Sequence, residues 1–325
     1  MPDVVGIDWG GTNFRAALVR LEENRAPEIL GRFEERRPSS GSYEEDLSWA
    51  GRQLDQLAPS VRHVGVGLAA MVRRRDGLMR KAPNMGWDVP PQGIRFGSLS
   101  GTIWKRDVVV VNDMSAIAWG EYRLGAARDT DDMLCVFWGT GLGGAVIADG
   151  RLLDGAGGVA VEIGHLKVRP GGRLCGCGAR GCVEAYVGGR QLLDRLRQDL
   201  SPEGPVGGSL VLQLAGGVVA AVHPGHVDEA ARRGDPYALG FWDEVAEFAA
   251  LAISHAVTLF DPGVVVAGGT VWMGCPDLRK RVEARVSALA NAPAAQGIQF
   301  RMAQLGDDAG VLGAALLCRD RLVSS

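Results

Sequence analysis

The chain has 325 residues, a formal net charge of −3 and 46% hydrophobic residues. This length is too great for one small core and predicts two packed lobes. The weak negative charge offers no general basic field for nucleic acid, and the longest apolar runs, such as Val108–Val111 and Val264–Ala267, are too short to span a bilayer. Because no basic or long apolar segment opens the chain, a cytoplasmic protein without a membrane partner is expected.

Strand and helix patterns alternate along the chain, which is typical of an α/β protein. The helix expected after Val108–Val111 has three candidate caps, Asn112, Asp113 and Ser115. The stretch Pro202–Gly217 is rich in glycine and only weakly patterned. In chain order, the expected elements are strands at Asp3–Asp8 and Phe14–Leu21, a helix at Tyr43–Leu57, strands at His63–Leu68 and Val108–Val111, a helix at Ser115–Leu124, strands at Met133–Trp138 and Ala145–Ala148, helices at 190–200 and Phe241–Phe260, a strand at Gly263–Ala267 and a helix at Val311–Arg319.

One local pattern occurs twice along the chain. An apolar strand, a polar glycine turn and a returning strand are found both in VVGIDWGGTNFRAALV near the start and in LCVFWGTGLGGAVIA from Leu134. Glycine hairpins are common, so the repetition alone is weak support. Two such units about half a chain apart predict two lobes of related topology that face each other across a ligand cleft.

Both glycine turns have chemistry that suits phosphate, although no P-loop or dinucleotide-binding motif occurs in the sequence. Glycines expose backbone N–H groups and let a phosphate approach where a Cβ would block it. Threonine hydroxyls can add donors, and Asp8 at its strand end can hold Mg²⁺ through water. Either turn alone is typical of an ordinary hairpin, but the pair favours phosphate. The residues concerned are Asp8, Gly10, Gly11 and Thr12 in the first turn and Gly139, Thr140 and Gly141 in the second.

A cysteine cluster lies within residues 162–184, EIGHLKVRPGGRLCGCGARGCVE. One imidazole and three thiols are a standard ligand set for a closed, tetrahedral structural zinc site. The glycines supply the tight or left-handed turns that wrapping around one ion needs. Buried thiols or a disulfide are the alternatives, and the polar sequence and cytosolic context disfavour them. The expected ligands are His165, Cys175, Cys177 and Cys182.

Over nearly its whole length the chain resembles the ROK family of sugar kinases, and in particular the bacterial ROK glucokinases. The resemblance implies a two-lobed, actin-like (ribonuclease-H-like) ATPase fold, Mg²⁺ and ATP as cofactors, and a homodimer or a dimer of dimers. The zinc segment with its flanking glutamates is its most specific part. The matching segments are DWGGTNFR at 8–15, APNMGW at 82–87, VNDMSAIAWGE at 111–121, GTGLGGAVIADG at 139–150, EIGH through CVEAY at 162–186, FDPGVVVAGG at 260–269 and GDDAGVLGAALL at 306–317.

The resemblance also implies roles for individual residues. Asp113 matches the family's catalytic aspartate, which would accept the proton of a sugar hydroxyl as that hydroxyl attacks the γ-phosphorus. From the residues alone, Asp113 could instead cap the next helix. His165 would bind zinc with one ring nitrogen and face the sugar with the other side of the ring, so the metal would position substrate. The implied sugar-binding residues are Asn84, Asn112, Asp113, Glu162, His165 and Glu184.

The nucleotide is expected to bind mainly through loops. By resemblance, Gly268 and Gly269 lie on the adenosine side, although either glycine could be a helix-start turn. Residues Gly139–Gly141 are the expected contacts of the β- and γ-phosphates. The family's organisation implies a small lobe at 1–115, to which a C-terminal helix at 307–325 returns, and a larger lobe at 116–306 that carries the zinc loop.

The sequence also bears on the identity of the sugar. The segments APNMGW and EIGH favour glucose phosphorylated at O6, but one or two side chains can change the preference of a pocket. The chain departs from many relatives at Ala69 and Ala70, where they have Pro-Gly, and at Arg73, where they have Asp. N-acetylmannosamine, N-acetylglucosamine, mannose, fructose and allose therefore stay open as substrates, and polyphosphate as a donor.

A different class of function must be set against the kinase. The same family includes repressors that bind DNA through an N-terminal winged helix-turn-helix, but the first expected strand starts at Asp3. The chain has only short basic runs, such as Arg36–Arg37 and Arg73–Arg75, so no nucleic-acid partner is expected. A sugar sensor without turnover is the remaining alternative.

Overall fold

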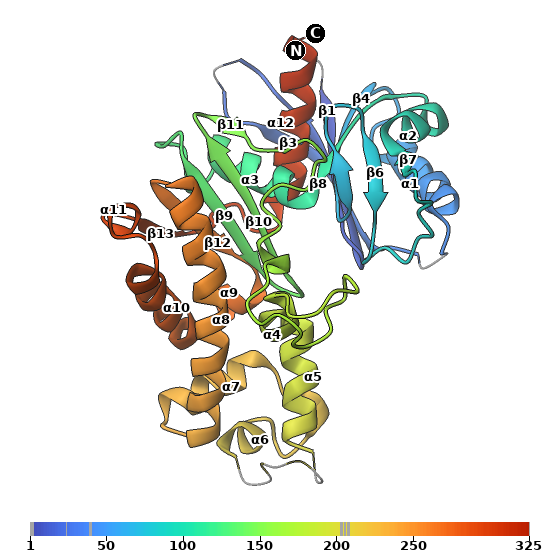
Figure 1. The fold of residues 1–325 in the computed structure, drawn as a ribbon. Coiled ribbons are helices and arrows are strands. Elements are labelled where there is room, and N and C mark those ends of the chain that lie inside the picture. The colour runs from blue at the N-terminus through green and yellow to red at the C-terminus, as the bar shows by residue number, and fades with distance from the viewer. Residues whose placement is uncertain are drawn as a thin grey trace. The chain divides into compact units, whose positions relative to one another are not determined.

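Figure 1 shows the computed structural model of the chain, which describes residues 3–23, 25–38, 41–201, 204, 206 and 209–324. Two five-stranded sheets and a three-stranded sheet alternate with helices along the chain, which confirms the predicted α/β class. Part of the glycine-rich stretch Pro202–Gly217 lies outside the described residues. Within the described ranges, no helix combines the length and apolar character that a membrane span requires.

The strands among the described residues form three sheets. In spatial order, the first contains β3 (Glu28–Arg36), β2 (Asn13–Arg20), β1 (Val4–Trp9), β4 (His63–Leu68) and β8 (Asp107–Asn112). The second contains β11 (Arg151–Leu152), β10 (Leu142–Ala148), β9 (Met133–Trp138), β12 (Val264–Gly268) and β13 (Gln299–Met302). The small sheet contains β5 (Met71–Arg73), β6 (Leu78–Lys81) and β7 (Ile94–Arg95).

Helices separate groups of strands along the chain. The α-helices are α1 (Tyr43–Leu57), α2 (Phe96–Trp104), α3 (Asp113–Arg123), α4 (Glu184–Val187), α5 (Gly189–Asp199), α6 (Leu210–Leu214), α7 (Pro224–Arg232), α8 (Pro236–Phe260), α9 (Thr270–Gly274), α10 (Pro276–Leu289), α11 (Ala292–Ala295) and α12 (Asp308–Ser324). Short 3₁₀ turns cover Ile163–His165 and Val219–Ala221.

The two large sheets have the same strand order. In the first, β1 pairs antiparallel with β2 and parallel with β4, and β4 pairs parallel with β8. In the second, β9 lies between β10 and β12, pairs parallel with β12, and β12 pairs parallel with β13. The pattern that occurs twice in the sequence therefore marks equivalent places in two similar sheets.

The first sheet is covered on both faces. Side chains alternate along β1, so that Val5, Ile7 and Trp9 join one core cluster and Val4 joins the other. The first cluster is rich in aromatic rings, and the second is formed with α12, which packs against β1, β4 and α3 (Figure 1). Because both faces of the sheet are buried, the positions of the ends of its strands are fixed, and so is the position of Asp8.

The contacts within the chain divide it into two compact units. Unit 1 consists of Met1–Asp131, Ala145–Ala160 and Ala303–Ser325, and unit 2 consists of Asp132–Gly144 and Val161–Met302. Helix α3 belongs to unit 1 because it packs along α12. The lobe boundary suggested by the sequence, at residues 115 and 116, lies in the first turn of α3.

The predicted elements agree with the structure to different degrees. Tyr43–Leu57, His63–Leu68 and Met133–Trp138 have the predicted bounds. The helix predicted at Phe241–Phe260 begins earlier, at Pro236, because the side chain of Asp235 caps it by accepting from Ala238 N. The helix predicted at Val311–Arg319 also extends further, over Asp308–Ser324. Helix ends depend on such caps and are the hardest part to read from periodicity.

Candidate active site

The first glycine turn joins β1 to β2 in unit 1. The N–H of Gly10 donates to the carbonyl of Asn13 at 2.9 Å, which closes the turn, and Thr12 is exposed at its tip. Asp8 lies near the carboxyl end of β1, 3.7 Å from the guanidinium of Arg15. A Cβ at Gly310 would lie 2.8 Å from the Cγ atom of Asp8, so the Asp8 carboxyl reaches the first turns of α12.

The surroundings of Asp8 favour its protonated form. Burial raises the pKa of Asp8 to about 6, Arg15 lowers it, and the nearby Asp307 and Glu34 raise it. A desolvated carboxyl beside other acids binds a cation readily, because the cation neutralises a negative charge that is poorly solvated in the buried site. Asp8 therefore has the properties expected of a residue that works beside a divalent ion.

The loop 82–87 lies directly on the first glycine turn. A Cβ on Gly11 would overlap the carbonyl oxygen of Asn84, so this close approach requires glycine. Met85 and Trp87 are buried, whereas Asn84 between them and the turn is exposed. The buried neighbours anchor the loop and present the Asn84 amide to solvent.

Asn112 and Asp113 stand where β8 ends and α3 begins. The Oδ1 atom of Asn112 accepts from Met114 N at 2.9 Å and from Ser115 N at 3.4 Å, so Asn112 is the cap among the three candidates. Its Nδ2 atom donates to the carbonyl of Ala70 at 3.1 Å. Asp113 is the first helical residue, and its Oδ1 atom accepts from Met114 N at 2.8 Å. The carboxylate of Asp113 therefore lies at the N-terminus of α3, where the helix dipole favours a negative charge.

The second glycine turn follows β9 in unit 2. The N–H of Gly139 donates to the carbonyl of Gly141 at 3.0 Å, and the N–H groups of Gly189 and Arg190 donate to Gly139 and Thr140. A Cβ on Gly141 would overlap the carboxylate of Glu184, whose Oε2 atom accepts from Leu142 N at 3.3 Å. The turn is thus bound by backbone groups at the start of α5 and by one glutamate.

A pocket of about 520 Å³ opens beside this turn, within unit 2. It brings the predicted phosphate residues Gly139 and Thr140 together with Thr270, which directly follows Gly268 and Gly269. Gly269 has a φ of 89°. The other residues that line the pocket are Gly189, Arg190, Leu193, Asp194, Arg197, Pro224 and Val271. The volume suits a nucleotide-sized ligand.

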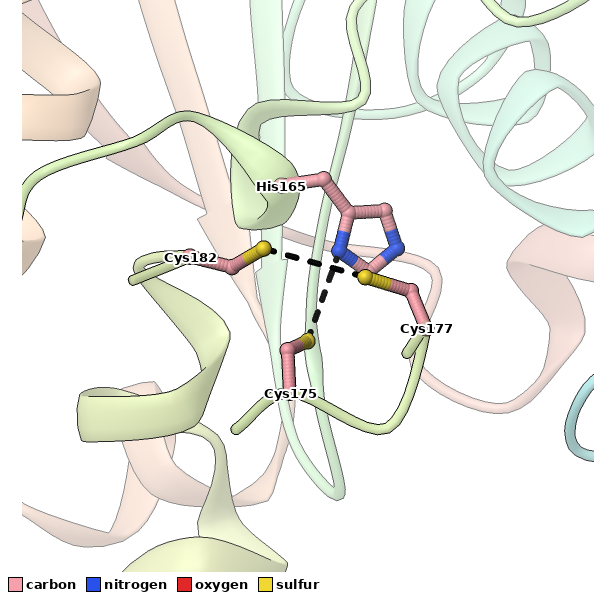
Figure 2. A group of neighbouring side chains, drawn as sticks. All are labelled: His165, Cys175, Cys177 and Cys182. Carbon is pink, nitrogen blue, oxygen red and sulfur yellow. Dashed lines mark hydrogen bonds between the residues drawn. The ribbon is translucent and has the colours of Figure 1, made fainter. Parts of the chain in front are cut away.

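The predicted metal ligands form one cluster in unit 2. Their ligand atoms all lie within 4.8 Å of one another (Figure 2). Figure 2 shows the Nδ1 side of the His165 ring turned toward the sulfur atoms, with Nδ1 3.8 Å from Cys175 Sγ. The Sγ atoms of Cys177 and Cys182 are 3.7 Å apart. The Nζ atom of Lys167 lies 2.7 Å from Cys182 Sγ.

The dimensions of the cluster do not match a disulfide and can be compared with those of a zinc site. A disulfide needs its sulfur atoms about 2.05 Å apart, and all six cysteines are free. Zinc–sulfur bonds of about 2.3 Å at tetrahedral angles put two sulfur atoms about 3.8 Å apart. The spacing of Cys177 and Cys182 agrees with the second value. Burial raises the pKa of the Cys175 thiol to about 12, so a metal would have to displace its proton.

Two glutamates flank the cluster within the same unit. Burial raises the pKa of the Glu162 carboxyl, while the nearby His165 lowers it and Glu184 raises it. The Oε1 atom of Glu184 also lies 3.8 Å from Cys175 Sγ. Glu162, His165 and Glu184 are therefore neighbours, as the predicted sugar-binding role requires.

The predicted site residues form two groups, each inside one unit. In unit 1, Asp8 and Asn112 lie near the carboxyl ends of β1 and β8, which both flank β4 in the parallel part of the first sheet. The members of this group are Asp8, Gly10, Gly11, Thr12, Asn84, Asn112 and Asp113. The members of the group in unit 2 are Gly139, Thr140, Gly141, Glu162, His165, Cys175, Cys177, Cys182, Glu184, Gly268 and Gly269.

Two features of the site escaped the sequence analysis. Arg37, interpreted as part of a basic cluster, is only 8% exposed and forms an ion pair with the buried Asp46. The pocket residues Arg190, Asp194 and Arg197 lie on α5, within a helix that the sequence predicts without assigning these residues a role. Neither the burial of Arg37 nor the pocket beside α5 can be read from a local pattern, because each depends on residues that are distant in sequence.

Comparison with known proteins shows the family and the fold of the chain. The chain is 32% identical over 320 residues to a glucokinase of Streptomyces coelicolor, covering 97% of both chains. It is 30% identical over 319 residues to an N-acetylmannosamine kinase of Escherichia fergusonii, covering 97% of this chain and 98% of that protein. The crystal structure of a ROK family glucokinase from Streptomyces griseus in complex with glucose and AMPPNP matches with a TM-score of 0.79 and 34% identity, covering 98% and 99% of the two chains.

The structural likeness confirms the expected actin-like, ribonuclease-H-like ATPase fold, here built from two α/β units. The model of the ROK family matches residues 4–321, which is nearly the whole chain. Because that match and relatives of 30% identity or more both span the full length, this chain belongs to the ROK family.

Proposed function

We propose that the chain is an ATP-dependent sugar kinase that transfers the γ-phosphoryl group of Mg-ATP to the 6-hydroxyl of glucose. The enzyme class, a hexokinase- or glucokinase-type phosphotransferase, rests on the family and on the full-length glucokinase relatives. One observation carries the choice of substrates: the chain is 34% identical to a glucokinase whose structure contains glucose and AMPPNP.

Asp113 is the proposed general base. Phosphoryl transfer needs a nucleophile that is held in line with the γ-phosphorus and can lose its proton as it attacks. The Asp113 carboxylate, at the junction of β8 and α3, would take that proton from the 6-hydroxyl. The preceding Asn112 uses its oxygen as the helix cap and one N–H on Ala70, which leaves its second N–H for a sugar hydroxyl.

The remaining sugar contacts are assigned by the same proposal. Asn84 is exposed on its anchored loop and can both donate to and accept from hydroxyls. Glu162 and Glu184 can accept from hydroxyls, and His165 can donate or accept with the ring nitrogen that does not face the cysteines. A pyranose with its ring of adjacent hydroxyls matches such a set of amides, carboxylates and imidazole.

The donor is proposed to bind through both glycine turns. The pocket in unit 2 would accept the nucleoside beside Thr270, with Gly139 and Thr140 at the phosphates. Arg190 and Arg197 add positive charge to the lining of this pocket. Gly10, Gly11 and Thr12 would contact the phosphates from unit 1, and Asp8 would hold Mg²⁺ through water. Polyphosphate, which lacks the nucleoside, is the alternative donor.

Zinc is the proposed metal of the Cys/His cluster. Three thiols and one imidazole fill all four positions of a tetrahedral ion, so the site is closed and structural. When bound, the ion would fix the ring orientation and tautomer of His165 and would order the loop between Cys175 and Cys182. The ammonium of Lys167 beside Cys182 offsets part of the thiolate charge.

Assembly and compartment complete the proposal. The family resemblance implies a homodimer or a dimer of dimers, working in the cytoplasm. Light scattering on the purified chain tests the assembly. A mass of 34.4 kDa, that of one chain, would contradict it.

A second candidate substrate class is an N-acetylhexosamine. It is favoured by the N-acetylmannosamine kinase of similar identity and by the unusual segment 69–73. In the structure, Arg73 is held by Asp76 at 2.9 Å, and Ala70 accepts from Asn112, so this segment touches a proposed sugar-binding residue. A change in its shape would alter which substituent fits beside Asn112.

A coupled ADP-release assay with Mg-ATP tests the function. The panel contains glucose, mannose, fructose, allose, N-acetylglucosamine and N-acetylmannosamine. We expect the highest kcat/KM with glucose. A preference for an N-acetylated sugar would keep the reaction and replace the substrate. Sugar binding without turnover on any member of the panel would support the sensor.

A further inference from the structure

Arg37 is a buried cation that joins two parts of the proposed site. It follows β3 in unit 1, and its side chain is 5% exposed. Its guanidinium donates from Nε to the carbonyl of Gly11 at 3.3 Å and from a terminal nitrogen to the carbonyl of Met85 at 2.6 Å. The first acceptor belongs to the glycine turn proposed for phosphate, and the second neighbours Asn84, proposed for the sugar.

The charge of Arg37 is balanced inside the unit. Its other terminal nitrogen pairs with Asp46 on α1, which is fully buried. The indole nitrogen of Trp87 donates to the same carboxylate at 2.8 Å, and the guanidinium lies 5.5 Å from the Trp87 ring centroid. Trp87 ends the loop that carries Asn84, so the Arg37–Asp46 pair forms hydrogen bonds with this loop at Met85 and at Trp87.

Stability alone does not account for such an arrangement. Buried ion pairs lose much of their Coulomb energy to desolvation, and apolar residues of the same volume are often as stable. What a guanidinium adds is geometry, because its rigid fork directs donors to several acceptors at fixed angles. Here the acceptors belong to chain segments about 75 residues apart in sequence, Gly11 and Met85.

We propose that Arg37 is a positioning residue that couples the phosphate turn to the sugar loop, so that binding of one substrate favours binding of the other. The inference rests on the proposed function for the identity of the two ligands. When a phosphate orders the turn at Gly11, Arg37 passes that constraint to Met85 and so to Asn84. Once the first ligand has ordered the turn and the loop, the second ligand loses less conformational entropy when it binds.

Arg106 offers a matched control within the same unit. It is also 8% exposed and donates to the backbone carbonyls of Leu54, Ala58 and Val61 and to Asp55. None of these acceptors belongs to a proposed substrate loop. Loss of either arginine removes a buried fork, but only Arg37 connects the two loops.

The experiment measures coupling between the two ligands. Calorimetry gives the Kd of glucose with and without saturating Mg-AMPPNP for wild type, Arg37→Met and Arg106→Met, and steady-state kinetics give kcat and KM. We expect AMPPNP to tighten glucose binding about fivefold or more in wild type and in Arg106→Met. In Arg37→Met this ratio should approach 1, with kcat/KM for glucose lower by about 10- to 100-fold.

A second variant tests the same inference if Arg37→Met does not fold. Arg37→Met leaves Asp46 charged and buried, so the double variant Arg37→Met/Asp46→Asn removes both charges and keeps an acceptor for Trp87. The same loss of coupling is expected in it. Equal coupling in the Arg37 variants and Arg106→Met, or no coupling in wild type, would overturn the inference.

The outcomes also separate this inference from the proposed function. If wild type binds glucose and AMPPNP with coupling that Arg37→Met abolishes, but does not turn over glucose, the kinase assignment would be refuted and the role of Arg37 supported. A chain that turns over glucose without coupling would support the kinase assignment and refute the role of Arg37. Binding of neither ligand would overturn both.

Discussion

The two glycine turns form a natural comparison, because each follows the same kind of strand. β1 (Val4–Trp9) and β9 (Met133–Trp138) have equal length, and Trp9 and Trp138 at their ends are fully buried. The residue before the tryptophan differs: Asp8 in the first strand and Phe137 in the second. The two sheets therefore share a topology while only the first has a carboxylate at this place.

The means by which each turn is fixed also differ. In unit 1 the turn is held by the backbone N–H of Arg37, which donates to Thr12, and by two cations, since the guanidinium of Arg37 donates to Gly11 and Arg15 lies beside Asp8. In unit 2 the turn is held by backbone N–H groups at the start of α5 and by Glu184, next to the Cys/His cluster. Equivalent strands thus position loops by different chemistry, and the two units should fail in different ways when altered.

The largest expected effect concerns the proposed base, which has no counterpart in the second sheet. β8 ends in Asn112 and is followed by Asp113, whereas β13 ends in Met302 and is followed by Ala303. Asp113→Ala should lower kcat by about 10²- to 10⁴-fold while glucose binding largely survives. Calorimetry and the ADP-release assay measure both quantities. Asp107→Ala, at the exposed start of β8, is the control, and near-normal turnover of the Asp113 variant would refute the assignment.

The next effect concerns zinc, which is proposed to bind in unit 2 alone. Cys177→Ser should reduce the bound zinc, raise the KM for glucose by about tenfold and lower the Tm, because His165 loses its fixed orientation. Zinc content is measured by atomic emission, and Tm by calorimetry. Cys318→Ser, a buried cysteine in unit 1, should keep the zinc. A metal-free Cys177 variant with unchanged kinetics would show that zinc does not position the sugar.

A smaller effect tests whether both turns need glycine for the same reason. At Gly11 a Cβ would overlap the backbone carbonyl of Asn84, so Gly11→Ala should lose about 1–3 kcal/mol of unfolding free energy. At Gly141 a Cβ would meet the carboxylate end of the Glu184 side chain, which can turn away, so Gly141→Ala should lose less. Gly176, in the metal loop, is the control, because a Cβ added there would have no other atom within 4 Å. Its alanine variant should change the unfolding free energy by no more than about 0.5 kcal/mol. Urea titrations give these values, and equal stability of all three variants would contradict the packing argument.

The smallest effect isolates the carboxylate that distinguishes β1 from β9. Because folding raises the pKa of Asp8 from 3.8 to about 6, the folded chain binds more protons between these values, and stability falls as pH rises through them. Without metal, Asp8→Asn should therefore be more stable than wild type by about 1–3 kcal/mol at pH 7 and equal to it below about pH 4.

Urea titrations across this pH range, in the presence of a chelator, measure the difference for Asp8→Asn. Asp76→Asn should instead be less stable than wild type at neutral pH. Arg73 holds the pKa of Asp76 at about 2, so Asp76 stabilises the fold at neutral pH and loses this effect only in strong acid. A wild-type advantage over Asp8→Asn at pH 7 would contradict the burial of Asp8.

Local features could be predicted from the sequence by itself. Apolar runs such as His63–Leu68 become buried strands because alternation and length are properties of one segment. The Cys/His cluster was predictable for a similar reason, since Cys175, Cys177 and Cys182 lie within one short loop with glycines to turn it. The two glycine turns and the class of fold follow from the same kind of local signal.

Only the tertiary structure decided what these segments meet. Arg37 stands beside Arg36 and Pro38, which is typical of a solvated turn, yet the fold brings Asp46 and Met85 to it and buries its charge. The nucleotide-sized pocket likewise needs α5 to lie beside Thr270. Such contacts join residues far apart in sequence, and their energy depends on desolvation and angle, which no local pattern records.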